Sequence, residues 1–401
     1  MKSKNIIKKI LILPNHQSHL SLALLCLAFI STPTFAEKTK ISLKDGLKIK
    51  RDDTEFQFKA RIMWDYDSFE GAHNEGKSSN DSELRHTRLT FQSEHNNEWE
   101  AKLQIDIDPA DKVADSFTTS VADVYIQYIG WKDLDITIGK AKEPFGLETM
   151  TSSKDTTTIE RSMASSAFSP GRNVGIGLSG EINQMTWALG LYEANEENED
   201  QNNYAVTTRF TYTPWHNEHN NLLHLGLAGS IRDFDGEEYK IKERAEVHTA
   251  DKIVTSAKIL ADQANLLGLE AAWVKGPFSL QAEYMTAAIK AEAEENANYT
   301  GYYLQASYFL TGESRLYEGG SFSEIKPHAK SGAWELAARY SVLDAEDNGS
   351  GVEATNVTFG INYYMNEYVR LMANYLNTEL TGEDLDQDSG NALSLRLQYS
   401  F

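Results

Sequence analysis

The sequence has few of the features that mark several common protein classes. Its 401 residues include one cysteine, so a disulfide framework is excluded. Its 38 Lys and Arg face 59 Asp and Glu, and the formal charge of −21 argues against a nucleic-acid partner, because a phosphate backbone would be repelled. Mean hydropathy is −0.47, with no apolar run of about twenty residues after the N-terminal region, which excludes a helical membrane protein. At 41% hydrophobic residues, disorder is excluded as well.

One class of membrane protein is consistent with all these observations. A transmembrane β-barrel has strands that alternate between a lipid-facing and a water-facing side, so it looks polar on average. The sequence alternates in this way near its start, where polar residues separate Phe56, Phe58, Ala60, Ile62, Trp64 and Tyr66. A period of two is the pattern of a strand between two different solvents.

The same pattern predicts sixteen strands. An even number suits an antiparallel barrel, and each segment is long enough to cross a bilayer when tilted. The predicted strands are 56–66, 84–92, 97–107, 121–129, 133–140, 173–182, 184–192, 204–213, 222–232, 264–274, 278–286, 301–310, 332–342, 354–364, 368–377 and 391–401.

The connections alternate in length. Those after odd-numbered strands are long, as in 141–172 and 233–263, whereas those after even-numbered strands are short, with 311–331 as the exception. Long loops at one end and short turns at the other are typical of outer-membrane barrels, with both termini on the turn side. A soluble β-sandwich has no reason to sort its loops in this way. We therefore expect an all-β fold, a sixteen-stranded antiparallel transmembrane β-barrel.

The N-terminus reads as an export signal. Lysines precede the apolar stretch 20–30, and the small residues Thr34 and Ala36 predict cleavage after Ala36. We expect residues 1–36 to be a signal peptide and 37–401 to be the exported barrel, with 37–54 as a periplasmic lead-in. The location expected is the outer membrane, in contact with its lipid.

A barrel of sixteen strands leaves an aqueous channel, so we expect passive diffusion of small hydrophilic solutes. Basic residues on the predicted inward face favour anions, and arginine suits phosphate because its planar fork binds oxyanions with two hydrogen bonds. Acidic residues such as Glu270 and Glu335 share that face, so the residues leave the selectivity open. The basic set is Lys59, Arg61, Arg88, Lys102, Arg209, Arg232, Arg339, Arg370 and Arg396.

The third long loop, 141–172, differs from the acidic loops. It is rich in Ser and Thr and contains Lys142, Lys154, Arg161 and Arg172. Hydroxyls and cations supply the hydrogen-bond donors that a constriction for oxyanions needs.

Several spaced stretches resemble the phosphate-selective porin O and P family and cover nearly all of the expected mature chain. They are LRHTRLTF (84–91), GKAKEPFGLE (139–148), TSSKDTTTIERS (151–162), FSPGRNVGIGLSG (168–180), YYLQASYFLTGESR (302–315) and GAWELAARYS (332–341). The resemblance implies a homotrimeric outer-membrane porin whose third external loop folds into the lumen. It also implies arginines that lead down the pore and a loop lysine that helps to bind phosphate at the constriction.

Carried onto this chain, the resemblance makes Lys154 the constriction lysine, with Ser152 and Ser153 as hydroxyl donors. Arg85 matches the first member of an Arg-Arg pair in the second strand. The second member is His86, which is largely uncharged at neutral pH and so weakens the positive field expected there. The C-terminal strand ending in Phe401 resembles the signal that such barrels present to their assembly machinery.

Three alternatives remain beside an anion porin. The first two are a general or non-phosphate porin and a structural or adhesive barrel, the latter favoured by the acidic loops. The third is a barrel hydrolase, which needs a hydroxyl nucleophile beside a histidine on the lipid side, whereas His86 and His224 are predicted to face the lumen. We therefore expect no enzymatic activity, and no metal or cofactor.

Overall fold

The computed structural model describes residues 39–401 except 44, 110–116, 195–202, 217–220, 292–294, 383–384 and 386–387. The expected signal peptide and its cleavage site after Ala36 lie outside the described residues. Residues Lys40–Phe401 form one compact unit.

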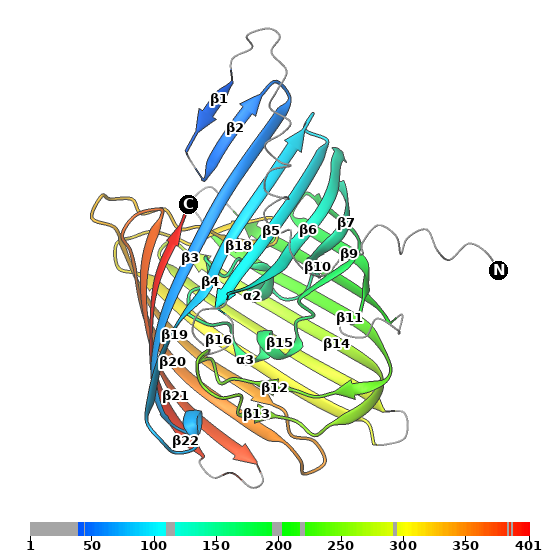
Figure 1. Ribbon diagram of the computed structural model, residues 1–401, viewed down its shortest axis with the longest axis vertical. Coiled ribbons are helices and arrows are strands. Elements are labelled where there is room, and N and C mark those ends of the chain that lie inside the picture. The colour runs from blue at the N-terminus through cyan, green and yellow to red at the C-terminus, as the bar shows by residue number, and fades with distance from the viewer. Residues whose placement is uncertain are drawn as a thin grey trace, which may run out of the picture. The chain divides into compact units, whose positions relative to one another are not determined.

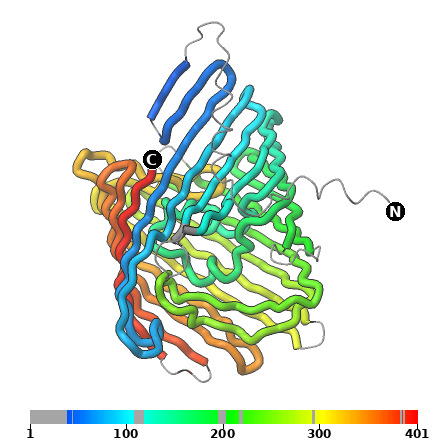
Figure 2. The backbone as a smooth tube through the Cα atoms, in the orientation of Figure 1, coloured from blue at the N-terminus to red at the C-terminus, as the bar shows by residue number. Residues whose placement is uncertain are grey.

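Sixteen antiparallel strands follow one another around a closed barrel, in which the last strand pairs with the first (Figures 1 and 2). Two further short strands extend the same sheet. The barrel strands are β3 (Thr54–Gly71), β4 (Ser79–His95), β5 (Trp99–Pro109), β6 (Phe117–Trp131), β7 (Leu134–Lys142), β8 (Arg172–Ile182), β9 (Met185–Glu193), β10 (Tyr204–His216), β11 (Leu222–Tyr239), β14 (Ile259–Lys275), β15 (Phe278–Ala291), β16 (Ala297–Phe309), β19 (Ala333–Asp344), β20 (Val352–Tyr364), β21 (Val369–Gly382) and β22 (Ser389–Ser400).

All sixteen predicted strands are confirmed, and most are longer than predicted. Strand β3 ends at Gly71 rather than at 66, and β11 ends at Tyr239 rather than at 232. These extra residues, such as DSFEG at the end of β3, no longer alternate apolar with polar. The backbone pairing continues through these residues, but neither side of the strand there carries a row of apolar side chains. The hydrophobic pattern therefore underestimates the strand length.

The side chains alternate between the two faces of the wall. On β16, Tyr302, Leu304 and Tyr308 are exposed on the outer side, whereas Tyr303, Gln305 and Ser307 between them are buried. Apolar side chains on the outer surface are stable in contact with lipid, and polar side chains face the interior of the barrel. The predicted alternation therefore describes the wall correctly.

The remaining elements are short and lie in the connections. Segment 141–172 carries the helices α2 (Leu147–Met150) and α3 (Met163–Phe168), and the 3-10 turn η3 (Ala72–Asn74) follows β3. Two small hairpins are formed by β12 (Lys242–Glu243) with β13 (Val254–Thr255), and by β17 (Leu316–Glu318) with β18 (Ser321–Ser323). In the part of the chain that the structure describes, no helix is both long and apolar enough to span a membrane.

The expected lead-in contains a hairpin of β1 (Lys40–Ser42) and β2 (Leu47–Arg51). Strand β2 pairs with the first residues of β3, Thr54–Phe58, where β22 does not reach. The other end of the chain meets the same strand, because Phe401 and Ala60 exchange two backbone hydrogen bonds of 2.8 and 3.0 Å. These pairings cover the open edge of β3, which would otherwise be free to pair with other chains.

Engineered cysteines test the closure of the barrel. Ser68 on β3 lies opposite Leu393 on β22, and paired Cα atoms in a sheet are about 5 Å apart, within the range a disulfide can bridge. The variant Ser68→Cys with Leu393→Cys is expected to form an internal disulfide on oxidation, seen as faster migration of the denatured protein without reductant. The matched control joins Ser68→Cys to Leu395→Cys, two residues out of register. Failure of the Ser68 and Leu393 pair to cross-link would contradict the closure, and equal cross-linking of the two pairs would contradict the register.

Candidate functional site

Inward-facing arginines hold the backbone of segment 141–172. On β19, Arg339 donates to Glu160 O at 2.9 Å. On β21, Arg370 donates to Thr156 O at 2.8 Å, and on β22, Arg396 donates to Ile159 O at 2.6 Å. Carbonyls of an irregular segment have no strand partners, and these guanidinium groups satisfy them.

Apolar contacts and a carboxylate hold the two short helices of the segment. Phe145 and Phe168 are almost fully buried in a cluster with residues of β15 and β16. Gly301 in the wall leaves room for helix α3. A Cβ added at Gly301 would lie 2.9 Å from Ala164 Cβ, which is closer than two such atoms normally approach. At the start of α2, the N–H groups of Leu147 and Glu148 donate to the Glu283 carboxylate at 2.6 and 2.8 Å. The carboxylate thereby satisfies donors that a helix start leaves free.

Glu160 anchors the segment through ion pairs with two arginines of the wall. Arg85 on β4 donates to both of its carboxylate oxygens, at 2.9 and 3.0 Å, and Arg396 donates to one of them at 2.8 Å. Burial alone would raise the pKa of Glu160, but Arg85 and Arg396 hold that pKa well below its usual range. The carboxylate therefore stays ionised.

An irregularity in the strand pairing brings Arg85 to this position. Met63 pairs with His86 and Trp64 with Leu84, so Arg85 is an extra residue in β4. Arg85 and His86 then approach each other, with Arg85 Nη1 3.4 Å from His86 Nε2. A bulge of this kind interrupts the alternation of faces, which a period-two pattern does not predict.

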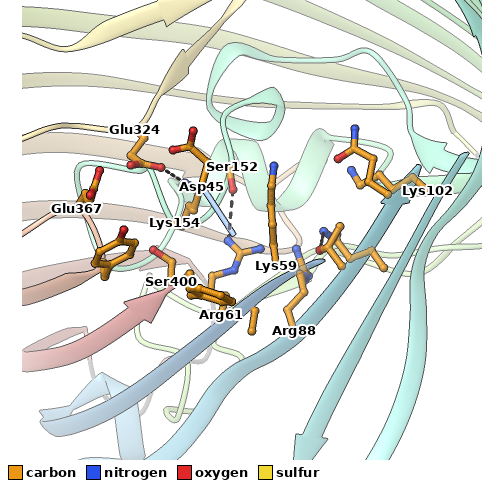
Figure 3. Close-up of a pocket in the computed structure, with 16 residues that line it drawn as sticks. Asp45, Lys59, Arg61, Arg88, Lys102, Ser152, Lys154, Glu324, Glu367 and Ser400 are labelled. Carbon is orange, nitrogen blue, oxygen red and sulfur yellow. Dashed lines mark hydrogen bonds and ion pairs between the residues drawn. The ribbon is translucent and has the colours of Figure 1, made fainter. Parts of the chain in front are cut away.

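A cavity of about 210 Å³ lies between this segment and the wall, and is called the basic cavity below (Figure 3). Adjacent strands β3, β4 and β5 supply one side, and segment 141–172 and several turns supply the rest. The lining residues are Asp45, Lys59, Ala60, Arg61, Arg88, Thr90, Gln92, Lys102, Gln104, Ser152, Lys154, Glu324, Glu367, Tyr368, Ser400 and Phe401.

Lys154 enters the basic cavity from segment 141–172. Its Nζ lies 2.7 Å from Glu324 Oε2 and 3.7 Å from Asp155 Oδ1. Burial opposes its charge, but the two carboxylates raise the pKa of Lys154 above its ordinary value. The ammonium is therefore charged at neutral pH and is already held by an internal carboxylate.

The cations of β3 are less compensated than their neighbours. Arg61 donates to the hydroxyls of Ser152 and Ser153 at 3.3 and 3.0 Å. Among the described residues, no ion pair is found for Arg61, and no hydrogen bond or ion pair for Lys59. By contrast, Arg88 pairs with Asp106, and Lys102 pairs with Asp123 at 2.9 Å. Uncompensated positive charge therefore gathers at Lys59 and Arg61.

The structure brings together some of the predicted site residues and separates others. The predicted residues that line the basic cavity are Lys154, Ser152, Lys59, Arg61, Arg88 and Lys102, and Ser153 is bonded to Arg61 beside it. The others do not line it and have partners outside it. They are Arg85, His86, Arg161, Arg172, Arg209, Arg232, Arg339, Arg370 and Arg396.

The arginines outside the basic cavity have close acceptors. Arg209 pairs with Glu270 at 2.6 Å, and Arg172 with Asp123 at 2.6 Å. Arg232 pairs with Glu143 at 2.9 Å, and Arg161 donates to two carbonyl groups within segment 141–172. Arg209 and Arg232 therefore contribute little net charge to the lumen. Arg172 shares Asp123 with Lys102, and among the described residues Arg161 has no carboxylate partner, so both keep part of their charge.

Two kinds of lining residue were not among the predicted site residues. Thr90, Gln92 and Gln104 are polar positions on inward faces, and the alternation of β4 and β5 could have found them. Glu324 and Glu367 lie in connections between strands, where the sequence has no periodicity. No signal in the sequence singled them out.

Comparison with known proteins agrees with this geometry. A family model described as phosphate-selective porin O and P matches residues 56–401. Porin O of Pseudomonas aeruginosa is 28% identical, over 96% of this chain and 98% of its own length.

Solved porins share the fold. The anion-selective porin from Comamonas acidovorans superposes with a TM-score of 0.57 at 11% identity, over 87% of this chain and 100% of that one. OmpT of Vibrio cholerae in its trimer form superposes with a TM-score of 0.55 at 12% identity, over 87% of this chain and 100% of that one.

The pH dependence of stability tests the anchoring by Glu160. Because its pKa is lowered, its ion pairs stabilise the fold above about pH 4.3, the usual pKa of an unfolded Glu, and are lost as the pH falls through the lowered pKa. Glu160→Gln is expected to lower the free energy of unfolding by about 3 kcal/mol at pH 7 and by progressively less below pH ~4. Urea unfolding in detergent micelles measures this difference.

The matched control is Glu379→Gln on β21, an exposed glutamate outside segment 141–172. A surface carboxylate of this kind is expected to change the free energy of unfolding by less than about 1 kcal/mol. An effect of Glu160→Gln that stays constant from neutral to acid pH would contradict the anchoring.

Proposed function

The chain belongs to the phosphate-selective porin O and P family and is an outer-membrane porin, and from this premise we propose that it passes small hydrophilic anions, phosphate among them. The observation that carries the proposal is the basic cavity. It combines the uncompensated cations Lys59 and Arg61 with the hydroxyl of Ser152. Positive charge beside a hydroxyl group suits an oxyanion, because both donate hydrogen bonds to it.

We infer that segment 141–172, the third external loop, folds into the lumen and narrows it. Its support is the set of wall side chains that bond to it, which come from β3, β19, β21 and β22. An inward-facing side chain can reach a segment only on the lumen side of the wall. Contacts from several strands at once favour a loop that crosses the channel.

The charge in this narrowing favours anions. In a partly dehydrated site, an uncompensated cation attracts an anion more strongly than it does in bulk water. The carboxylates Asp106 and Asp123 are each engaged with cations, so they offer little attraction to a passing cation. Asp45, Glu324 and Glu367 also line the basic cavity, but they face five lining cations, which are Lys59, Arg61, Arg88, Lys102 and Lys154. The excess of cationic side chains favours an anion beside Lys59 and Arg61.

We infer a homotrimer in the outer membrane, as in the trimer form of OmpT from Vibrio cholerae. Export would use residues 1–36 as a cleaved signal peptide, and the C-terminal strand ending in Phe401 would engage the barrel-assembly machinery. The β1–β2 hairpin and Phe401 both adjoin the start of β3, which favours a periplasmic position for the hairpin.

Electrical recording tests the proposed function. In planar bilayers with a KCl gradient, the wild-type channel is expected to give a reversal potential of anion selectivity. Inorganic phosphate is expected to reduce the chloride current, and Lys154→Ala is expected to weaken that block, because it removes one donor from the basic cavity and leaves Lys59 and Arg61.

Each outcome of the recording has a defined meaning. A cation-selective reversal potential would refute the anion porin. Anion selectivity without phosphate block would indicate a general or non-phosphate porin. The absence of conductance steps would favour a structural or adhesive barrel.

Lys59 offers a sharper test of the electrostatics. Because it has no partner among the described residues, Lys59→Gln is expected to lower the chloride-to-potassium permeability ratio by roughly two-fold or more at low salt, and by less at high salt. The control Lys77→Gln changes a lysine whose side chain is 73% exposed and lies in a loop outside the cavity. Equal ratios for the two variants would contradict a role for Lys59.

A further inference from the structure

The connection 311–331 is the long exception among the short turns, and it meets segment 141–172. Its β17–β18 hairpin bonds to the wall, where Tyr317 Oη lies 2.6 Å from His224 Nδ1 and Gly320 O accepts from Arg209 at 2.8 Å. The buried ring of Phe322 packs in a cluster with Leu147 of α2. The hairpin is therefore fixed against both the wall and the segment.

Glu324 follows this hairpin directly and faces the basic cavity (Figure 3). Its carboxylate accepts from Lys154 at 2.7 Å. The side chains of Glu324 and Lys154 are 27% and 28% exposed, so solutes in the cavity can reach both groups. Among the described residues, Lys154 is the only cation in an ion pair with Glu324.

This arrangement places an internal anion on a cation that faces the cavity. An oxyanion bound between Lys59, Arg61 and Lys154 has to share or displace the Glu324 carboxylate at Lys154. Glu324 and Lys154 belong to the same chain. Glu324 therefore binds Lys154 without the loss of translational and rotational freedom that a free oxyanion undergoes on binding. The competing carboxylate therefore weakens any oxyanion bound there.

From this geometry, and resting on the proposed function, we propose that Glu324 determines selectivity by competing with solute oxyanions for Lys154. Conduction requires that binding be strong enough for entry and weak enough for release. Glu324 weakens retention at Lys154 and lowers the net positive charge of the basic cavity. It thereby shifts the channel from tight phosphate binding toward faster passage of anions in general.

The test compares Glu324→Gln with Glu318→Gln in full-length channels. Glu318 lies on the same hairpin, is exposed and does not line the basic cavity. Glu324→Gln is expected to half-block the chloride current at a phosphate concentration roughly five-fold lower than wild type, and to raise the chloride-to-potassium permeability ratio. Glu318→Gln is expected to match wild type in both measurements.

Two more variants show whether the effect passes through Lys154. Glu324→Asp keeps the carboxylate and is expected to stay close to wild type. In a Lys154→Met background, Glu324→Gln is expected to lose most of its effect on phosphate block, because the two residues are then no longer coupled. Heat-dependent gel mobility of each variant checks that the barrel is folded.

The two proposals fail in different ways. If wild type is anion-selective but Glu324→Gln behaves as Glu318→Gln does, the inference about Glu324 is overturned and the proposed function stands. An unchanged effect of Glu324→Gln in the Lys154→Met background also overturns it. A cation-selective or non-conducting wild-type channel overturns the proposed function, and the role of Glu324 with it.

Discussion

A charged side chain turned into the barrel needs an opposite charge or several hydrogen-bond partners, because burying it without them costs a large free energy. The arginines of β19, β21 and β22 find those partners in segment 141–172, whose carbonyl groups and Glu160 carboxylate accept their hydrogen bonds. The requirement acts in both directions, since an irregular segment away from bulk water also needs donors for its carbonyls. Anchoring of the segment and compensation of the arginines are therefore the same interaction.

The charge that remains is small and local. Most inward arginines are paired with a carboxylate, whereas Lys59 and Arg61 on β3 are not paired with one among the described residues. This explains how a chain with a formal charge of −21 can present a positive site to a solute. Net charge sums over the whole surface and loops, but a passing ion responds to the uncompensated groups within a few ångströms.

The basic cavity also contains its own competitor. Lys154 and Glu324 lie 170 positions apart in sequence, and the connections that carry them are fixed by separate contacts with the wall. A porin that binds its solute must also release it, and an internal carboxylate beside the binding cation is a simple way to balance the two. If Glu324 has this role, sequence differences in connection 311–331 would alter selectivity within the family without changing the wall.

The sequence by itself determined the sixteen strands and the direction in which most side chains point. Alternation with a period of two is a local property, since neighbouring residues of a strand lie on opposite faces whatever the rest of the chain does. It therefore placed Arg339, Arg370 and Arg396 on the inward face, and the resemblance to a porin family singled out Lys154. Only the tertiary structure decided which of these cations are compensated. Arg396 meets Ile159 across 237 positions, Glu324 lies in a connection without periodicity, and the bulge at Arg85 interrupts the pattern. Such pairings depend on distances between segments far apart in the chain, which closure of the barrel sets and local spacing does not record.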